Sequence, residues 1–234
     1  MTYPTAYPRP PIVEAVIDFR FSERKFDGKA LDALVDAIGS EFPGRESNAE
    51  AEGDEVITDL SSPDGRRHLL CAKDQLSVHV LAPYPGWESF LATAQQAVGA
   101  LPVEVRASGL SAITVRYIDR ISLREKAPVF NEYVTLMPNR PPGFPDLAAF
   151  STSFMGKDLD SNNLISVYLA SLGPNEDGNK AEQPALIYEV RVGRLGTIAF
   201  DNDEAWVPIV EELHQRQREV FEASITDKTR ELFQ

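Results

Sequence analysis

The sequence predicts an α+β protein: two similar β-α-β-β-β-α halves form one mainly antiparallel sheet, with the long helices packed on one face. Two observations predict this class. Segments with apolar residues at every second position alternate with segments whose apolar residues recur at helical spacing. The same order of strands and helices then occurs twice along the chain. We therefore expect a single domain, residues 1–234, with pseudo-repeats at about residues 10–106 and 107–234.

The first half opens with a strand and a helix. In Val13–Phe21, apolar side chains alternate with polar ones, which is typical of a strand with one buried face. Apolar residues at helical spacing predict a helix over residues 29–42, which Pro43-Gly44 ends. Residues 45–54 are small, acidic and glycine-containing, which indicates a mobile loop.

Three strands and a second helix complete this half. Strand-like runs occupy residues 55–60, 67–72 and 75–81, and a tight turn at Lys73-Asp74 joins the last two. After a break at Pro83–Gly86, apolar residues recur at helical spacing over residues 87–101, and Pro102 ends that helix.

The second half repeats this order. The expected elements are a long strand at 113–123, a short helix at 129–137, strands at 150–157, 164–172 and 185–192, and a long helix at 203–223. Residues 138–149 and 173–184 are long loops rich in proline and glycine, where binding residues are often found. By element order alone, the arrangement resembles the saddle of the TATA-binding-protein fold. A cup of strands around a central helix is the competing shape.

Three short blocks lie at the two ends and in the centre of the chain. They are Pro10–Ala15 (Pro-Pro-Ile-Val-Glu-Ala), Arg116–Arg120 (Arg-Tyr-Ile-Asp-Arg) and Ile225-Thr226-Asp227. Together they resemble the signature of a sporadically distributed bacterial family with no established activity. The resemblance covers the whole chain; it implies a shared fold and supplies no catalytic residues.

The composition is acidic. The chain has 36 acidic and 23 basic residues, a formal net charge of -13. This charge disfavours sequence-independent binding to nucleic acid and to anionic membranes, so we expect neither as a partner. The single cysteine, Cys71, lies in an apolar run and is expected to be buried. We find no transmembrane span and no signal peptide in the sequence, and we expect a cytoplasmic protein.

The sequence contains no strong catalytic or cofactor-binding motif. The three histidines, His68, His79 and His214, are too scattered to indicate a zinc site, so we expect neither a metal nor a cofactor. His68 and His79 are expected to be hydrogen-bonded structural residues. His214 is expected on the solvated face of the closing helix.

The central strand holds the candidate binding residues. Alternation places Arg116 and Arg120 on one face and Asp119 on the other, more apolar face. A charged side chain on a buried face needs a partner, and candidate partners lie on the neighbouring strands. The candidate residues are Arg116, Arg120, Asp119, Glu189, Arg191 and Asp18, with Glu14 as a further ion-pair partner. Two alternatives stay open: an ion-pair ladder across the open sheet face, or an arginine-lined groove for a carboxylate-bearing group.

These patterns favour a non-enzymatic binding or protein-interaction module. The alternative is an enzyme acting on a small acidic substrate, in which Arg116 and Arg120 bind the substrate and Asp119 or Glu189 transfers protons. We expect a protein partner, and a second copy of the chain is one candidate. The apolar pair Leu232-Phe233 is expected to dock on such a second subunit.

Overall fold

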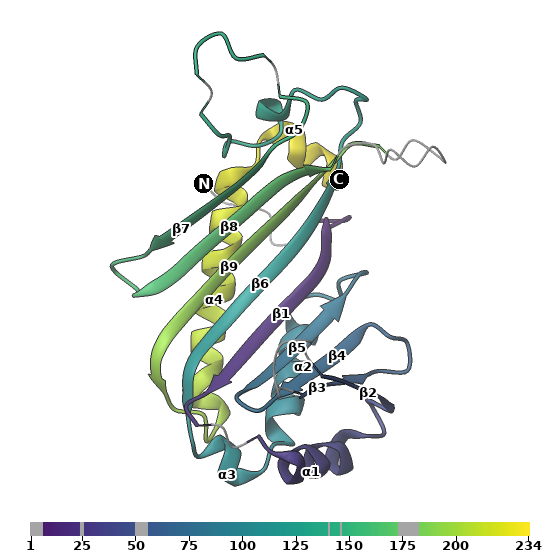
Figure 1. Cartoon of the computed structure of the whole chain (residues 1–234), viewed down its shortest axis with the longest axis vertical. Helices are drawn as coiled ribbons and strands as arrows, with labels where there is room; N and C mark the ends of the chain where they lie inside the picture. Colours follow the sequence, from purple (N-terminus) through teal and green to yellow (C-terminus); the bar gives the residue numbers. More distant parts are fainter. Residues whose placement is uncertain (1–6, 24–25, 50–55, 140, 146, 173–182) are drawn as a thin grey trace.

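The computed structural model describes residues 7–23, 26–49, 56–139, 141–145, 147–172 and 183–234. They form one nine-stranded antiparallel sheet in the order β2-β3-β4-β5-β1-β6-β9-β8-β7 (Figure 1). The strands are β1 (Ile12–Phe21), β2 (Gly44–Ala49), β3 (Val56–Ser61), β4 (Arg67–Ala72), β5 (Gln75–Leu81), β6 (Leu110–Ser122), β7 (Ser151–Lys157), β8 (Asn163–Leu172) and β9 (Ala185–Ile198). The helices are α1 (Gly28–Ile38), α2 (Trp87–Gly99), α3 (Val103–Arg106), α4 (Asp203–Ser224) and α5 (Asp227–Arg230), with short 3-10 turns η1 (Phe130–Glu132) and η2 (Glu231–Phe233).

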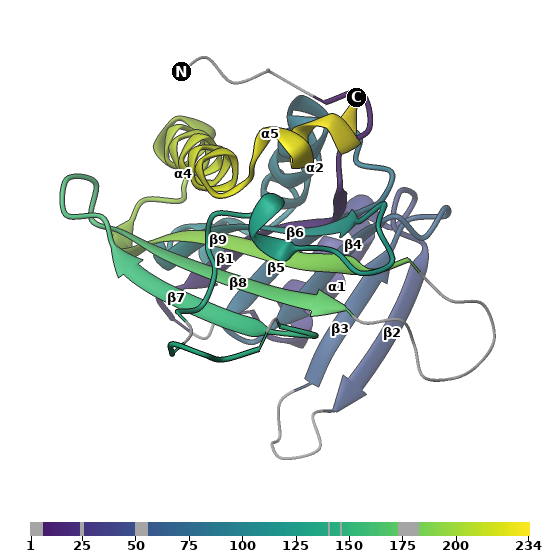
Figure 2. The same ribbon diagram turned by 90° about the horizontal axis from the view of Figure 1, so that it is seen from above.

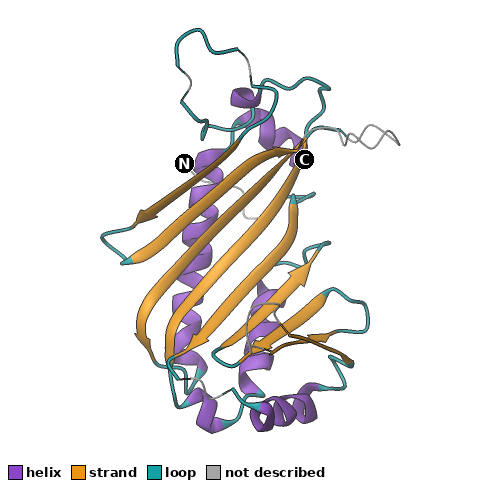
Figure 3. Ribbon diagram, viewed as in Figure 1, coloured by secondary structure: helices purple, strands orange, loops and turns teal. Residues whose placement is uncertain are grey.

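The two long helices lie on the same face of the sheet. Figure 2 shows α2 and α4 above the strands, and Figure 3 shows α4 running along the sheet behind them. Residues of β1 and β6 that face these helices are apolar except for Asp119, whereas those on the opposite face are largely polar. The predicted α+β class and the packing of the long helices on one face are confirmed.

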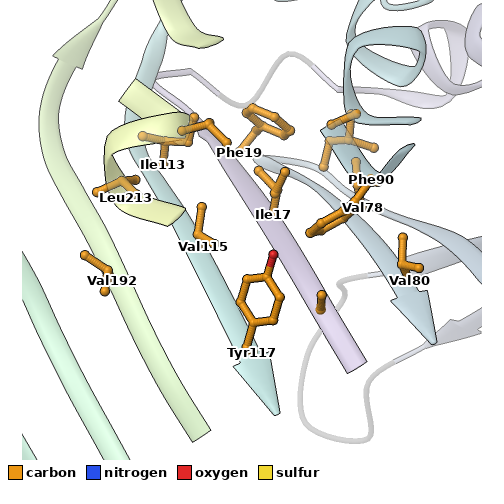
Figure 4. Packing of buried hydrophobic residues seen from close by; sticks show 14 of the residues in the cluster. Ile17, Phe19, Val78, Val80, Phe90, Ile113, Val115, Tyr117, Val192 and Leu213 are labelled. Carbon is orange, nitrogen blue, oxygen red and sulfur yellow. The ribbon is translucent and has the colours of Figure 1, made fainter. Parts of the chain in front are cut away.

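Apolar side chains from both halves of the chain meet in one core between the sheet and these helices. Ile17 and Phe19 of β1 are fully buried, as are Ile113 and Val115 of β6. Figure 4 shows them beside side chains from β5, β9, α2 and α4. Burial of a side chain of this size stabilises the fold by about 1.5–3 kcal/mol. The ring of Phe19 also packs edge-on against Trp206, with 5.1 Å between the ring centroids.

Strand pairing at the centre of the sheet joins the two halves. β1 pairs with β5 on one side and with β6 on the other, and β6 pairs in turn with β9. The first strand of each half therefore lies beside the last strand of the same half. A common origin of the halves rests on this order of elements and stays a prediction.

The structure corrects the expected loop at residues 45–54. Gly44–Ala49 form β2, which pairs with β3 along its whole length, and residues 50–55 lie outside the described part. The hydrogen bonds offered by the edge of β3 outweigh the weak strand propensity of these small and polar residues. The first half thus has one strand more than predicted.

The helix predicted over residues 129–137 is also wrong, because only the 3-10 turn η1 forms there. The backbone of this segment pairs with the end of α4 instead. Val134 bridges to Ile225, and the Thr135 amide donates to the Ser224 carbonyl at 2.9 Å. Backbone groups used in this pairing do not form helical hydrogen bonds.

We predict that residues 1–106 alone do not fold cooperatively. Removal of the second half exposes one edge of β1 and deletes Phe200 and Trp206, which pack against Phe19. Circular dichroism during heating should show no sharp transition for the fragment, with the full chain as the control. A sharp, independent transition of the fragment would contradict the single-domain interpretation.

Candidate functional site

The arginines predicted as binding residues lie on the face of the sheet opposite α2 and α4. Arg116 and Arg120 share one face of β6, and Arg191 of β9 lies directly across from Arg116. Arg116 Nη1 lies 3.8 Å from Glu189 Oε2, and Arg191 Nη2 lies 3.3 Å from Glu189 Oε1. The expected ion pair of Arg116 forms, at a separation beyond hydrogen-bond length. Because these side chains are partly exposed, each pair contributes roughly 0–1 kcal/mol.

Asp18 does not extend these ion pairs into a ladder. Its carboxylate accepts a hydrogen bond from Ser77 Oγ at 2.6 Å and one from Gln75 Nε2 at 3.2 Å. Its partner on β6 is Thr114 rather than an arginine. The strand register therefore gives Asp18 neutral donors, which corrects its predicted place among the arginines.

Two of the histidines are hydrogen-bonded structural residues, as expected. His79 Nδ1 lies 2.6 Å from Glu14 Oε1, and His68 Nδ1 lies 3.0 Å from Asp59 Oδ1. The hydrogen bond from His79 lowers the pKa of the Glu14 carboxyl group. Glu14 is thereby engaged with His79 on the open face.

Asp119 lies on the helix-covered face of β6. It is 2% exposed, and no described residue forms a hydrogen bond or an ion pair with its carboxyl group. Burial raises the pKa of Asp119 to about 8, so the group is protonated at neutral pH. The sheet separates it from Arg116 and Arg120. An enzyme in which these arginines and Asp119 share one substrate does not fit this geometry.

Asp119 lines a cavity of about 760 Å³, here named the α4 cavity. Its other walls come from residues 7–12, which lead into β1, residues 84–88 at the start of α2, and the second half of α4. The volume lies within the roughly 300–1,000 Å³ of small-molecule sites. Six lining residues decide its chemistry: Tyr84, Trp87, Tyr117, Asp119, His214 and Gln217.

Helix α4 brings two of these side chains to the cavity. The Asn202 side chain caps the helix by accepting a hydrogen bond from the Ala205 amide at 3.1 Å. His214 and Gln217 follow about one turn apart on one side of the helix. Gln217 is 3% exposed, and its side-chain amide has no hydrogen-bond partner among the described residues. Asp119 and Gln217 thus both line the cavity, and neither side chain forms a hydrogen bond with a described residue.

A chain of hydrogen bonds fixes another part of the wall. The hydroxyl oxygens of Tyr84 and Tyr117 lie 2.8 Å apart, and the Tyr117 hydroxyl lies 3.2 Å from His214 Nδ1. The imidazole of His214 stacks on Trp87, with 3.8 Å between ring centroids. Burial lowers the pKa of His214 to about 3, so the ring is neutral. A neutral imidazole has one donor and one acceptor nitrogen, so Nδ1 and the two hydroxyl groups can form one continuous chain of hydrogen bonds.

Residues 7–11, here named the N-terminal strap, close one side of the cavity. The Tyr7 hydroxyl donates to Glu222 Oε1 at 2.7 Å, and Arg230 Nε donates to Glu222 Oε2 at 3.0 Å. The Arg9 amide donates to the Phe233 carbonyl at 3.0 Å. The strap is thus attached to α4 and to the C-terminal turn.

The predicted role of Leu232-Phe233 is corrected by this packing. Phe233 is 3% exposed, and its ring lies edge-on to Tyr7 at 5.1 Å and stacked on Phe221 at 6.3 Å. Leu232 is partly buried against the same core. This pair belongs to the protein's own core and is not free to dock on a second subunit.

His214, beside Gln217, was expected on the solvated face of the closing helix. The structure corrects this, because both side chains line the α4 cavity and Gln217 is buried. One signal was present: Gln217 occupies a position in the apolar stripe of α4, which continues through Val210, Leu213 and Phe221. Tyr84 and Trp87 gave no comparable signal, because only the folded chain brings them to α4.

No protein-family model and no curated protein matches this chain. In the described part of the chain, no helix is both long and apolar enough to cross a membrane. Nor do its histidine, cysteine, aspartate and glutamate side chains form a group of three that could hold a metal ion.

We predict that the stability of the Asp119→Asn variant increases relative to that of the wild type as the pH rises. An unfolded Asp titrates at about 3.9, whereas burial gives Asp119 a pKa of about 8. Between about pH 4 and about pH 8, the folded state therefore binds more protons than the unfolded state. The free energy of unfolding of the wild type falls as the pH rises through this range. Asn does not ionise, so the variant should gain on the order of a few kcal/mol at alkaline pH.

Urea unfolding of both proteins from about pH 5 to about pH 9 measures this difference. Asp36→Asn, which changes an exposed carboxylate on α1, is the matched control and should show no such trend. A constant difference between Asp119→Asn and wild type at every pH would contradict the prediction.

We also predict no salt-sensitive affinity for duplex DNA or RNA. The net charge is -13, and Glu189 lies beside both Arg116 and Arg191 on the open face. Titration at about 50 mM salt gives electrostatic binding its best chance, because screening is weak. Submicromolar binding that weakens steeply with added salt would overturn this expectation.

Proposed function

We propose that this protein is a non-enzymatic binding protein whose α4 cavity takes up a small polar organic molecule. The observation that carries the proposal is the pair Asp119 and Gln217, two buried polar side chains that line one cavity without partners among the described residues. The polar atoms of both side chains are open to the cavity, so a molecule inside it can form hydrogen bonds with them.

The other walls favour binding over proton transfer. Tyr84 and Tyr117 are hydrogen-bonded to one another, and burial raises the pKa of both hydroxyl groups. Burial keeps His214 neutral through its lowered pKa, and its Nδ1 is engaged with Tyr117. Together with Trp87, these rings offer aromatic surface to the body of an organic ligand.

Trp87 makes occupancy of the cavity measurable. The chain has two tryptophans, and Trp206 is fully buried in the core. We expect at least one compound from a panel of organic amines, carboxylic acids, sugars and nucleosides to change Trp87 emission. The same compound should raise the melting temperature by several degrees, because it binds only the folded protein.

Two variants control this experiment. Trp87→Phe should lose the emission change, and Gln217→Phe, which removes the amide and fills part of the cavity, should also lose the melting shift. Circular dichroism and the melting curve of each free variant check its folding. The proposed function would be contradicted by a panel without effect on the wild type, or by an unchanged shift in Gln217→Phe.

The open face of the sheet supports a second candidate function, the binding of a protein partner. Met155 of β7 and Tyr168 of β8 are 81% and 43% exposed there, and Tyr168 lies directly across from Glu189. Exposed apolar side chains beside charged ones, here Glu189 and Arg191, are typical of protein-binding surfaces.

Partner capture from cells tests this second candidate. Tyr168→Glu should abolish the retention of a partner that the wild type binds. Val103→Glu, at a position on α3 that is 65% exposed, is the control and should retain it. Equal retention by both variants would exclude the open face.

A further inference from the structure

We infer that the group recognised in the α4 cavity is a protonated amine on a small organic molecule, paired with Asp119 beside the aromatic wall. The inference rests on the proposed function, because it names the ligand chemistry of the same site.

The charge of the cavity wall favours a cation. The acidic lining residues are Glu88, Asp119, Glu211 and Glu222, and Arg218 is the basic one among those described. Glu222 already pairs with Arg230 at 3.0 Å. His214 adds no positive charge, because burial lowers its pKa to about 3. An anionic ligand would meet more negative than positive charge in this cavity.

Asp119 is the acceptor that an ammonium group fits best. Its carboxyl group is buried in the wall and has no partner among the described residues. An ammonium supplies three N–H donors and a positive charge, and charge-assisted hydrogen bonds are roughly twice as strong as neutral ones. The side-chain carbonyl of Gln217 can accept a second N–H. An apolar ligand would leave both groups without partners.

The aromatic wall adds a second attraction for the same ligand class. Tyr7, Tyr84, Trp87, Tyr117 and Phe221 all line the cavity. Aromatic faces attract organic cations, and the attraction is larger where water is excluded. The rings also cover the apolar body to which the amine is attached. A carboxyl group in a cavity lined by aromatic rings therefore selects an organic amine over an inorganic cation.

Binding releases a proton. In the free protein at neutral pH, Asp119 holds a proton because burial raises its pKa to about 8. An aliphatic amine is already protonated there, with a pKa of about 10.4. When the ammonium pairs with the carboxylate, the Asp119 proton passes to the buffer and no covalent bond changes. Affinity should therefore rise about tenfold per pH unit below about pH 8.

Other titratable or charged groups face this region from each surrounding element. They are Tyr7 on the strap, Tyr84 and Glu88 by α2, Tyr117 on β6, Tyr188 on β9, and Glu211, His214, Arg218 and Glu222 on α4. Burial raises the pKa of the tyrosines and lowers that of His214, away from neutral pH in both cases.

Calorimetric titration with matched probes tests the inference. The amines are 2-phenylethylamine and tryptamine; the neutral counterparts are 2-phenylethanol and tryptophol, and the anionic ones are 3-phenylpropanoate and indole-3-propanoate. We expect at least one amine to bind at least about tenfold more tightly than its alcohol and its acid. Titration in phosphate and in Tris at neutral pH should show release of close to one proton per amine bound.

Asp119→Asn should lose the preference for amines and the proton release, while Asp36→Asn on α1 should keep both. If an acid or alcohol binds more tightly and Gln217→Phe abolishes that binding, the amine inference fails and the proposed function stands. Amine binding that Asp119→Asn leaves unchanged also overturns the inference. If no probe binds and the wider panel has no effect on Trp87 emission, both proposals fail.

Discussion

The antiparallel pairing of β1 with β6 is the interaction on which the rest of the structure depends. Both strands lie at the centre of the sheet, and each pairs on its other side with the last strand of its own half. The pairing sets Ile17 opposite Val115, and both are fully buried. The apolar face formed in this way extends across both halves, so α2 and α4 each cover only part of it (Figure 1).

The pleat of β6 separates two kinds of chemistry. Arg116 and Arg120 face the open side. There, water solvates the charged side chains, so their ion pairs have little effect on the stability of the fold. Tyr117 and Asp119 face the helices, where burial disfavours the charged form of the Asp119 carboxyl group and so raises its pKa. A shift of the register by one residue would exchange these two sets between the faces, so the strand pairing also determines the site.

Strands were predictable where the sequence pattern within the segment itself determines the structure. The predicted runs 67–72 and 75–81 agree with β4 and β5 residue for residue. Residues 129–137 were not predictable as a loop, because the backbone partners that override helix formation, Ser224 and Ile225, lie far along the chain. For the same reason β2 was missed, since its strand character comes from the neighbouring edge of β3.

The candidate site was likewise predictable only where it depends on local sequence. Alternation alone placed Arg116, Arg120 and Asp119 on their correct faces of β6. It could not reveal the α4 cavity, because the other walls come from the strap, the start of α2 and the second half of α4. The local sequence hint was Gln217, a polar residue at an apolar position of an amphipathic helix.

Two buried carboxyl groups in the wall of the α4 cavity differ in one respect. Glu222 accepts hydrogen bonds from Tyr7 and Arg230, so the chain itself satisfies this carboxylate. Asp119 has no such partner among the described residues, and neither does Gln217. Both side chains line the cavity, so their polar atoms are open to a ligand. A molecule that hydrogen-bonds to them would do for Asp119 and Gln217 what Tyr7 and Arg230 do for Glu222.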